Sequence, residues 1–506
     1  MISAFASTWK VPELRERILF TLAMVVIVRL GVHVTLPGVD ATAIDRFLEF
    51  QQSRGSDSSP GAGVGVMLSM FSGGGLTKLG LFALGIMPYI SASILMQLMT
   101  AVVPKLSKLS REDGGRQKIT QYTRVATIII ALVQGYLLAS NLNNPSVIPG
   151  LTDFDATKFG RLVPSHGPMF IFMTVLTIVT GTLLLMWIGD QITDRGIGNG
   201  VSLIITVNII SALPGSLVET WDTLISGGKG GVGSAVFLVF LVAFLLFVIA
   251  ATISITQAQR RIAIQYAKRV MGRKQLGGQT QYLPLKVNYA NVMPIIFATA
   301  ILSLPPFILA QVAKNAEWAA DVQRWFVPNN WVYYLIAGLM IFFFSYFWVA
   351  TMFQPSEIAE NLKRSGGYVP GVRPGKPTAD FLDYTMTRLT FAGAIFLAIL
   401  FFLPFIVQKM PIGIIGKELP PMVTTFFGGT SLLIIVGVLL DFMRQVETHL
   451  LQRNYDGFLR KGKIKGRYDK LQNTGERVSS NTLLYLLIFA AILIVVGASV
   501  WIYKGW

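Results

Sequence analysis

The sequence predicts an all-α protein that crosses a membrane many times. Charged residues make up only 14% of the chain, whereas an ordinary soluble domain carries about 25%. Hydrophobic residues make up 53%, and the mean hydropathy is +0.58. Stretches without Asp, Glu, Lys or Arg recur throughout the 506 residues. Because such a stretch can cross about 30 Å of hydrocarbon as a helix, most of the chain is expected to lie in a bilayer.

Eleven stretches are long enough to cross, since a spanning helix needs about 20 apolar residues. Only the first contains a central charge, Arg29, which is expected either to face the bundle or to reach the membrane surface, with a structural role. The first stretch lacks the cleavage pattern of a signal peptide and is expected to be retained. The stretches are residues 18–36, 79–104, 125–152, 162–189, 196–218, 230–259, 287–313, 325–356, 389–408, 419–440 and 478–503.

The distribution of basic residues predicts the orientation. The chain has 43 Lys and Arg residues against 26 Asp and Glu, a formal net charge of +17. Most of the basic residues fall in segments that share one side if the N-terminus is cytoplasmic. Cytoplasmic loops of membrane proteins are enriched in Lys and Arg. The N-terminus is therefore predicted to be cytoplasmic, and eleven crossings would place the C-terminal Trp506 outside.

A short apolar segment lies between the first two spans. Residues 64–77 read VGVMLSMFSGGGLT, too short to cross and interrupted by three consecutive glycines. One interpretation is a surface loop. The other is an element at membrane depth, where irregular backbone persists only if protein or a water-filled cavity surrounds it. The pattern alone leaves both open.

The chain lacks the residues of most catalytic sites. It has no phosphate-binding loop, no H-E-x-x-H, no G-x-S-x-G and no cysteine, and its three histidines are scattered. The sequence therefore predicts no enzyme, cofactor or metal site. A secondary transporter is the alternative function, but the acidic residues that such proteins often bury near the membrane centre are missing. A membrane docking platform without a pore is a third interpretation.

Two basic loops stand out, and the first has more basic residues than orientation requires. Residues 257–286 carry seven basic residues and no acidic one, and residues 356–388 contain the stretch SGGYVPGVRPGKPT. Prolines and glycines are typical of an open loop. Each loop is either a solvated cytoplasmic face or a docking surface for a polyanion or an acidic partner.

Several long motifs together resemble one family. They are MFSGGGLTKLGLFALGIMPYISASILMQL at 70–98, GRQKITQYTR at 115–124, LLLMWIGDQITDRGIGNGVSLII at 183–205, QRRIAIQYAKR at 259–269, LPLKVNYANVMPIIFA at 283–298, NLKRSGGYVPGVRPGKPT at 361–378 and FFGGTSLLIIVGVLLDFMRQVET at 426–448. In this order the chain resembles SecY, the central channel subunit of the bacterial protein translocase. The resemblance covers residues 14–467.

The resemblance implies a clamshell of two pseudo-symmetric halves with ten family helices. The N-terminal half is residues 1–218 and the C-terminal half is residues 230–448, joined by a hinge at 219–229. A basic cytoplasmic linker at 449–480 and an additional transmembrane helix at 481–506 would follow. This eleventh helix departs from the family pattern, and the sequence does not decide whether it is a peripheral helix, a clade-specific extension or an added segment.

The resemblance also implies a pore ring and a plug. Carried over position by position, the ring falls on Ile86, Ile90, Val201, Ile205, Ile296 and Ile434, and the plug includes Met70, Phe71, Ser72, Gly73, Gly74 and Gly75. Residues four apart share a helix face, so each of the first two ring pairs can face one lumen. Val201 replaces the family's usual isoleucine. The plug assignment favours a cavity around residues 64–77.

The remaining assignments concern a side exit and partners. Family helices two, three, seven and eight border a lateral gate, with Gln97, Gln134 and Asn288 at its polar positions. Contacts for the ribosome or the motor ATPase SecA would include Arg273, Lys274 and Arg373. Other implied partners are the small subunits SecE and SecG, signal-bearing preproteins and membrane lipid. The expected function is a protein-conducting channel of the general secretory pathway in the bacterial inner membrane, which also releases transmembrane segments into lipid.

Overall fold

The computed structural model describes the chain from Pro12 to Arg460, with gaps. The gaps are residues 55–68, 113, 144, 146–147, 149–150, 152–153, 165–166, 222–231, 267–268, 272–273, 277–279, 313–317, 319–321, 323–324, 327–329 and 410–429. The chain divides into two compact units, Met1–Leu450 and Leu451–Trp506. Both halves expected from the resemblance fall within the first unit, and the predicted additional helix lies outside the described residues.

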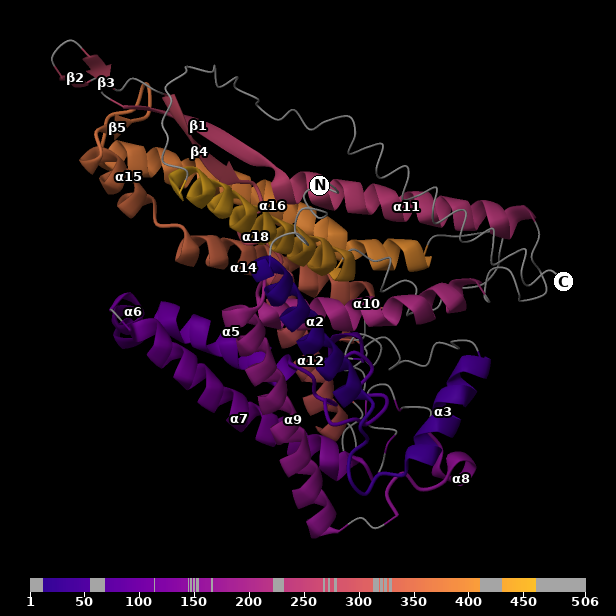
Figure 1. Ribbon diagram of the computed structural model, residues 1–506. Coiled ribbons are helices and arrows are strands. Elements are labelled where there is room, and N and C mark those ends of the chain that lie inside the picture. The colour runs from indigo at the N-terminus through magenta and orange to yellow at the C-terminus, as the bar shows by residue number, and fades with distance from the viewer. Residues whose placement is uncertain are drawn as a thin grey trace. The chain divides into compact units, whose positions relative to one another are not determined.

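The structure is predominantly helical (Figure 1). Each of the first ten predicted spans corresponds to a helix with shifted ends. The helices are α2 (Pro12–Val32), α3 (Ala41–Arg54), α5 (Met87–Val102), α6 (Pro104–Arg111), α7 (Gly115–Asn141), α8 (Ala156–Phe159), α9 (Pro168–Arg195), α10 (Gly200–Trp221), α11 (Val232–Gln257), α12 (Met293–Val312), α14 (Trp331–Met352), α15 (Pro355–Arg364), α16 (Lys376–Lys409) and α18 (Thr430–Arg460).

Five of the described helices are long and apolar enough to cross a membrane by themselves: α7, α9, α10, α14 and α16. Helices α5 and α6 qualify as a pair that bends by 104°. The bend lies at Val103, which is extended because the ring of Pro104 disfavours helical backbone in the residue before it. Shorter apolar helical stretches lie in α11 and α12. An all-α polytopic protein is therefore confirmed.

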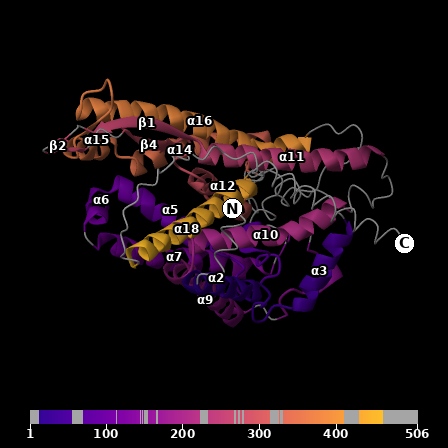
Figure 2. The same cartoon turned by 45° about the horizontal axis from the view of Figure 1, so that its top comes forward.

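The basic segment at 257–286 contains β-structure. Strand β1 (Gln259–Tyr266) pairs antiparallel with β4 (Thr280–Lys286) and with β5 (Gly367–Tyr368). A second hairpin joins β2 (Arg269–Met271) to β3 (Lys274–Leu276). Ile262 and Ile264, two residues apart on β1, are both buried, so one face of the sheet packs inward. Figures 1 and 2 show this sheet next to α15.

Four groups of buried side chains organise the first unit. The largest joins residues of α2, α5, α9, α10, α12, α14 and α18, and a second packs α3 and α8 against the segment that precedes α5. In the second group the rings of Phe47, Phe154 and Phe159 lie between 5.3 and 5.6 Å apart. Main-chain hydrogen bonds from Leu36 to Leu79 (2.9 Å) and from Leu81 to Val34 (2.7 Å) hold that segment to the end of α2.

Candidate channel site

The six residues assigned to a pore ring meet in the largest buried group. Ile86 caps the N-terminal end of α5 and Ile90 lies one turn later, while Ile205 comes from α10 and Ile434 from α18. All four are buried, with Ile86 fully inaccessible. Val201 of α10 and Ile296 of α12 are partly buried and pack against the same group. Residues up to 348 positions apart in sequence are thus brought together by four helices.

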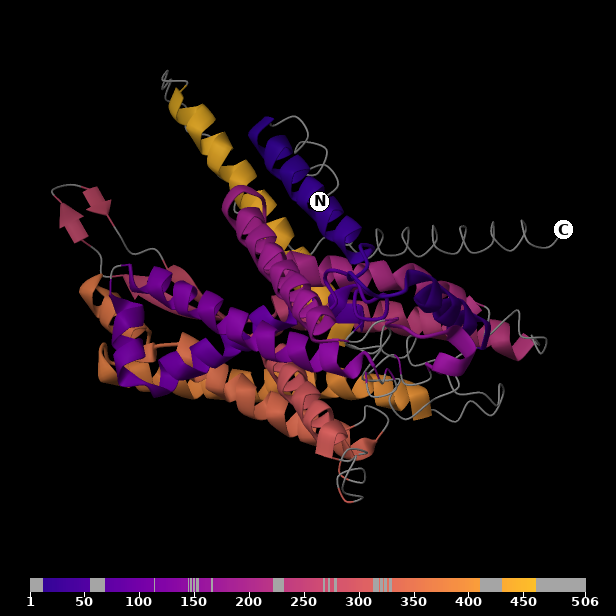
Figure 3. The same cartoon turned by 90° about the horizontal axis from the view of Figure 1, so that it is seen from below.

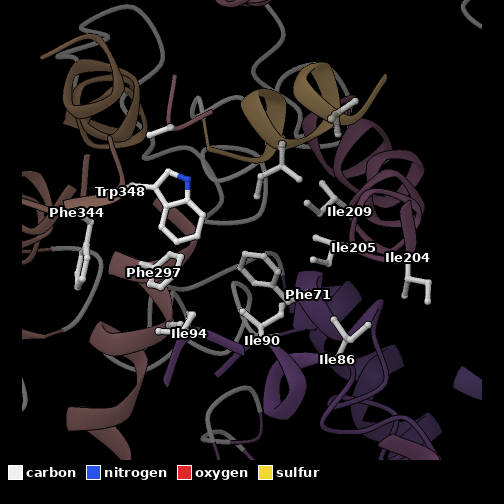
Figure 4. Close-up of a cluster of buried hydrophobic side chains, with 14 of the residues drawn as sticks. Phe71, Ile86, Ile90, Ile94, Ile204, Ile205, Ile209, Phe297, Phe344 and Trp348 are labelled. Carbon is white, nitrogen blue, oxygen red and sulfur yellow. The ribbon is translucent and has the colours of Figure 1, made fainter. Parts of the chain in front are cut away.

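An aromatic side chain from the glycine-bearing segment enters this group. Phe71 is 9% exposed and Met70 is 4% exposed, and both belong to the same buried group as the ring residues. Figure 4 shows Phe71 pointing between Ile90 of α5 and Ile205 of α10. The segment at 69–79 is therefore packed inside the helical bundle, and the surface-loop interpretation of its described part is wrong.

Glycines shape the segment in two ways. Gly73 has a φ of +65°, a left-handed conformation that side chains disfavour. A Cβ atom at Gly73 would also lie 2.5 Å from Asn208 Oδ1 and 2.7 Å from Arg29 Nη1. At Gly75 a Cβ atom would lie 2.5 Å from the carbonyl oxygen of Phe82. Only glycine therefore allows the chain to fold back this tightly.

Two side chains from neighbouring helices bind main-chain oxygens of the segment. Nη1 of Arg29, on α2, donates to the oxygen of Gly73 at 3.1 Å. Nδ2 of Asn208, on α10, donates to the oxygen of Phe71 at 2.9 Å. Asn208 is only 2% exposed. Arg29 therefore faces the bundle, one of the two alternatives left open by the sequence.

Within the segment, Ser72 supports the turn. Its Oγ donates to the oxygen of Ser69 at 3.2 Å and accepts from the amide of Leu76 at 3.1 Å. Main-chain bonds from Gly74 to Ser69 (2.7 Å) and from Gly80 to Gly75 (2.9 Å) close successive turns. The segment is thus a compact element held by its own backbone and by two side-chain donors from neighbouring helices.

The helices assigned to the lateral gate are in contact across the two predicted halves. Helix α5 packs against α7 on one side and touches α12 on the other, and α12 packs against α14. Ile94 of α5 lies beside Phe297 of α12 in Figure 4, and both are buried. The contact between α5 and α12 is therefore apolar at this point.

The three polar residues assigned to the gate do not bond to one another in the described residues. Gln97 Nε2 donates to Ser93 Oγ of its own helix at 3.3 Å, and its buried Oε1 has no hydrogen-bond partner in the described structure. Asn288 Nδ2 donates to the oxygen of Asn291 at 3.1 Å, within its own turn. Gln134 is half-buried on α7. Their role at a gate stays a prediction.

Two of the three residues predicted to dock a partner, Lys274 and Arg373, fall within the described residues. Arg273 lies outside the described residues, and Lys274 begins β3. Arg373 is exposed in the turn after β5, where its main-chain oxygen accepts from Thr378 Oγ1 at 2.8 Å. Because β5 pairs with β1, the two basic segments that the sequence suggested as separate loops share one sheet.

A second contact between the predicted halves involves α2 and α18 (Figure 3). Leu14 of α2, Ile197 of the turn between α9 and α10, and Val446 of α18 pack together. The amide of Gly198 donates to Gln445 Oε1 at 2.7 Å. This polar contact joins segments 247 residues apart.

Sequence reasoning missed Asn208 and gave Arg29 no partner. The available signal for Asn208 was an amide side chain in the middle of the apolar stretch 196–218, and polar residues inside spans usually face protein. Nothing in the sequence indicates that its partner lies 137 residues away. Among the described residues, no cluster of three or more His, Cys, Asp or Glu could hold a metal ion.

Comparisons with known proteins give the family. The SecY family model matches residues 80–443. The protein translocase subunit SecY of Thermus thermophilus is 41% identical over 471 residues, which covers 92% of this chain and all of the relative. The SecY of Streptomyces scabiei is 39% identical over 462 residues, with 91% of this chain and all of the relative covered.

Solved structures show the same fold. "The structure of a protein conducting channel" superposes with a TM-score of 0.54 at 17% identity, covering 89% of this chain and 95% of the other. "Sec61 in the Canine ribosome-channel complex from the endoplasmic reticulum" gives a TM-score of 0.52 at 15% identity with the same coverage. Sequence and fold agree, and the chain belongs to the SecY family of membrane-spanning translocase subunits.

Proposed function

We propose that this chain forms a protein-conducting channel whose constriction is the apolar ring at Ile86, Ile90, Val201, Ile205, Ile296 and Ile434. The observation that carries the proposal is the insertion of Phe71 among ring residues from separate helices. A segment that is too short to span the membrane but fills the centre of the helical bundle would block a path through that centre. Residues 69–79 are therefore assigned as the described part of the plug.

The chemistry of the ring suits a channel for unfolded chains. Apolar side chains around a constriction disfavour water and ions, so the ring closes by dewetting. Because they offer no hydrogen bonds, they bind no substrate side chain strongly and yield to polypeptides of any sequence. A solute transporter would instead need fixed polar groups at its binding site.

The contact between α5 and α12 is proposed as the side exit for apolar segments. Ile94 and Phe297 meet there through dispersion and burial alone, so an arriving apolar helix can replace each surface with a similar one. Polar contacts between membrane helices average only about 0.6 to 2 kcal/mol. The gate is therefore weak enough for a signal sequence to open.

Energy for translocation would come from a partner. The SecA motor or a ribosome would dock on the basic sheet formed by β1, β4 and β5, near Arg373. One structural relative is a Sec61 channel bound to a ribosome. SecE and SecG are the proposed small subunits. The proposed orientation in the bacterial inner membrane places the N-terminus and this sheet in the cytoplasm, with the C-terminus outside.

Reconstitution tests the channel function directly. The full chain with its small subunits is placed in lipid vesicles, with SecA and a preprotein outside, and protease-protected preprotein is measured with and without ATP. We expect ATP-dependent protection that disappears when the signal sequence is removed. Uptake of a small solute with no preprotein uptake would instead support the transporter alternative.

The docking assignment has its own test. Arg373→Glu should lower ATP-dependent import about tenfold, because charge reversal repels an anionic partner surface. The chain should still insert into the membrane, since Arg373 lies outside the spans. Lys376→Glu, three positions further along the chain at the first residue of α16, is the matched charge reversal. Equal effects of both substitutions would mean that net charge matters rather than the Arg373 contact.

A further inference from the structure

The plug is bound from outside by two donors that recognise only its backbone. Arg29 donates to the oxygen of Gly73 at 3.1 Å, and Asn208 donates to the oxygen of Phe71 at 2.9 Å. The acceptors are two residues apart, and the donors come from two different helices, α2 and α10. Hydrogen bonds to main-chain oxygens hold the segment in place, and they do not require particular side chains at most of its positions.

We propose that Arg29 and Asn208 are positioning residues that anchor the plug to the N-terminal half of the channel and hold it closed. This inference rests on the proposed channel function and names residues that set its resting state. Neither residue belongs to the apolar ring. Their role is to keep Phe71 seated in the ring when no substrate is present.

The glycine at position 73 is part of the same arrangement. A Cβ atom there would lie 2.5 Å from Asn208 Oδ1 and 2.7 Å from Arg29 Nη1, so any side chain would push both donors away. The left-handed φ of +65° adds a second requirement for glycine. The lack of a side chain at Gly73 therefore leaves the space in which Arg29 and Asn208 reach the backbone of the segment.

Burial gives the two hydrogen bonds their effect. Asn208 is 2% exposed inside the bundle, whereas Arg29 is partly buried, so the penalty for a lost acceptor applies fully to Asn208 and in part to Arg29. A buried donor that loses its acceptor costs more than the hydrogen bond contributes when made. Moving the plug would leave both donors without these acceptors. The closed position is therefore favoured over any position that removes the two carbonyl groups.

The location of the donors indicates the order of opening. Both lie in the N-terminal half, whereas the ring residues Ile296 and Ile434 of the other half join the plug's buried group through apolar side chains. Separating the halves can leave both hydrogen bonds intact. The plug would then stay with the N-terminal half at first and be released in a later step.

Resting ion leak measures plug retention. We expect Asn208→Leu to raise the leak of the reconstituted complex about fivefold to tenfold, the factor associated with one neutral hydrogen bond. Arg29→Met should raise it more, because a charged donor is lost, and Arg29→Lys should lie between. Thr206→Val is the matched control: Thr206 is buried on the same helix, but its Oγ1 donates only to Ser202 of that helix. The control should leave the leak within about twofold.

Removal of the plug separates anchoring from general damage. In a channel lacking residues 69–75, Asn208→Leu should cause no further leak, because its acceptor is gone. An equal rise with and without the plug, or no rise in the intact channel, would overturn the anchoring proposal.

ATP-dependent preprotein import by the unaltered complex is measured in the same vesicles. Its absence would refute the channel function, and its presence with an unchanged Asn208→Leu leak would refute the anchors alone.

Discussion

The residues proposed as ring and plug share one apolar buried group, but only the proposed plug is also held by directional hydrogen bonds. The ring consists of aliphatic side chains that make no directional bonds, while the plug is fixed by donors aimed at its backbone. A surface that must yield to every substrate gains from the lack of hydrogen bonds. A segment that must return to one position gains from having them. The difference suggests that selectivity against ions and retention of the plug are separable properties.

The largest expected effect comes from placing a charge in the ring. Ile86→Asp puts a carboxylate at a fully inaccessible position, where an unpaired charge is strongly disfavoured. Water should enter with it and abolish dewetting, so the resting ion leak should rise about a hundredfold. Ile86→Val removes only one methylene and should change the leak little. A leak that stays low in the aspartate variant would contradict the ring assignment.

A smaller effect is expected from crowding the plug anchors. Gly73→Ala must adopt a left-handed backbone and also displace Asn208 Oδ1 and Arg29 Nη1. We expect about a tenfold rise in resting leak, because strain of this kind costs about 1 to 3 kcal/mol in the closed state. The measurement is ion conductance across bilayers that contain the complex.

Gly74→Ala provides the control for that prediction. Gly74 also has a left-handed φ, +86°, but a Cβ atom there meets no atom within 4 Å. It therefore tests the backbone strain without the contact with the anchors. If Gly74→Ala and Gly73→Ala leak equally, strain accounts for the effect and the contact with Arg29 and Asn208 does not.

The sequence predicted the spans better than the elements between them. A stretch free of charge must be buried in lipid or protein, so its position follows from composition. Helix ends do not, because a helix can continue beyond the bilayer: α7 begins at Gly115, although the apolar stretch begins at residue 125. The sheet was missed because Ile262 and Ile264 stand among arginines whose charge dominated the interpretation. Pairing of β1 with β5 joins segments about 100 residues apart.

The candidate site also has a part that the sequence predicted and a part that it did not. Ring positions could be assigned from the motifs of the resemblance, and the structure brings all six into one buried group. The anchoring residues Arg29 and Asn208 could not be assigned from the sequence. The hydrogen bond between Asn208 and Phe71, for example, depends on tertiary packing and leaves no local pattern. Directional contacts across long sequence distances are therefore the part of the mechanism that required coordinates.

A third prediction, with a smaller expected effect, replaces a polar side chain at the proposed gate with an apolar one. Gln97 buries Oε1 without a partner in the described structure, and Nε2 makes one long bond to Ser93. Gln97→Leu should stabilise the closed gate by about 1 kcal/mol, because an incompletely satisfied amide is replaced by an apolar group. Insertion of a weakly hydrophobic signal sequence should slow about fivefold. Ser93→Ala is the control, and an unchanged insertion rate in Gln97→Leu would remove Gln97 from the gate.

The smallest expected effect concerns Val201, where the family's usual isoleucine is one methylene larger. Val201 is partly buried and packs against the ring group. If the proposed ring forms the constriction, the added methylene of Val201→Ile enlarges the apolar surface that closes it. One methylene contributes about 0.8 kcal/mol when buried, so the resting leak should fall about threefold to fourfold, with preprotein import unchanged. A higher leak would mean that the extra methylene overpacks the bundle, and the ring would then depend on shape rather than on apolar area.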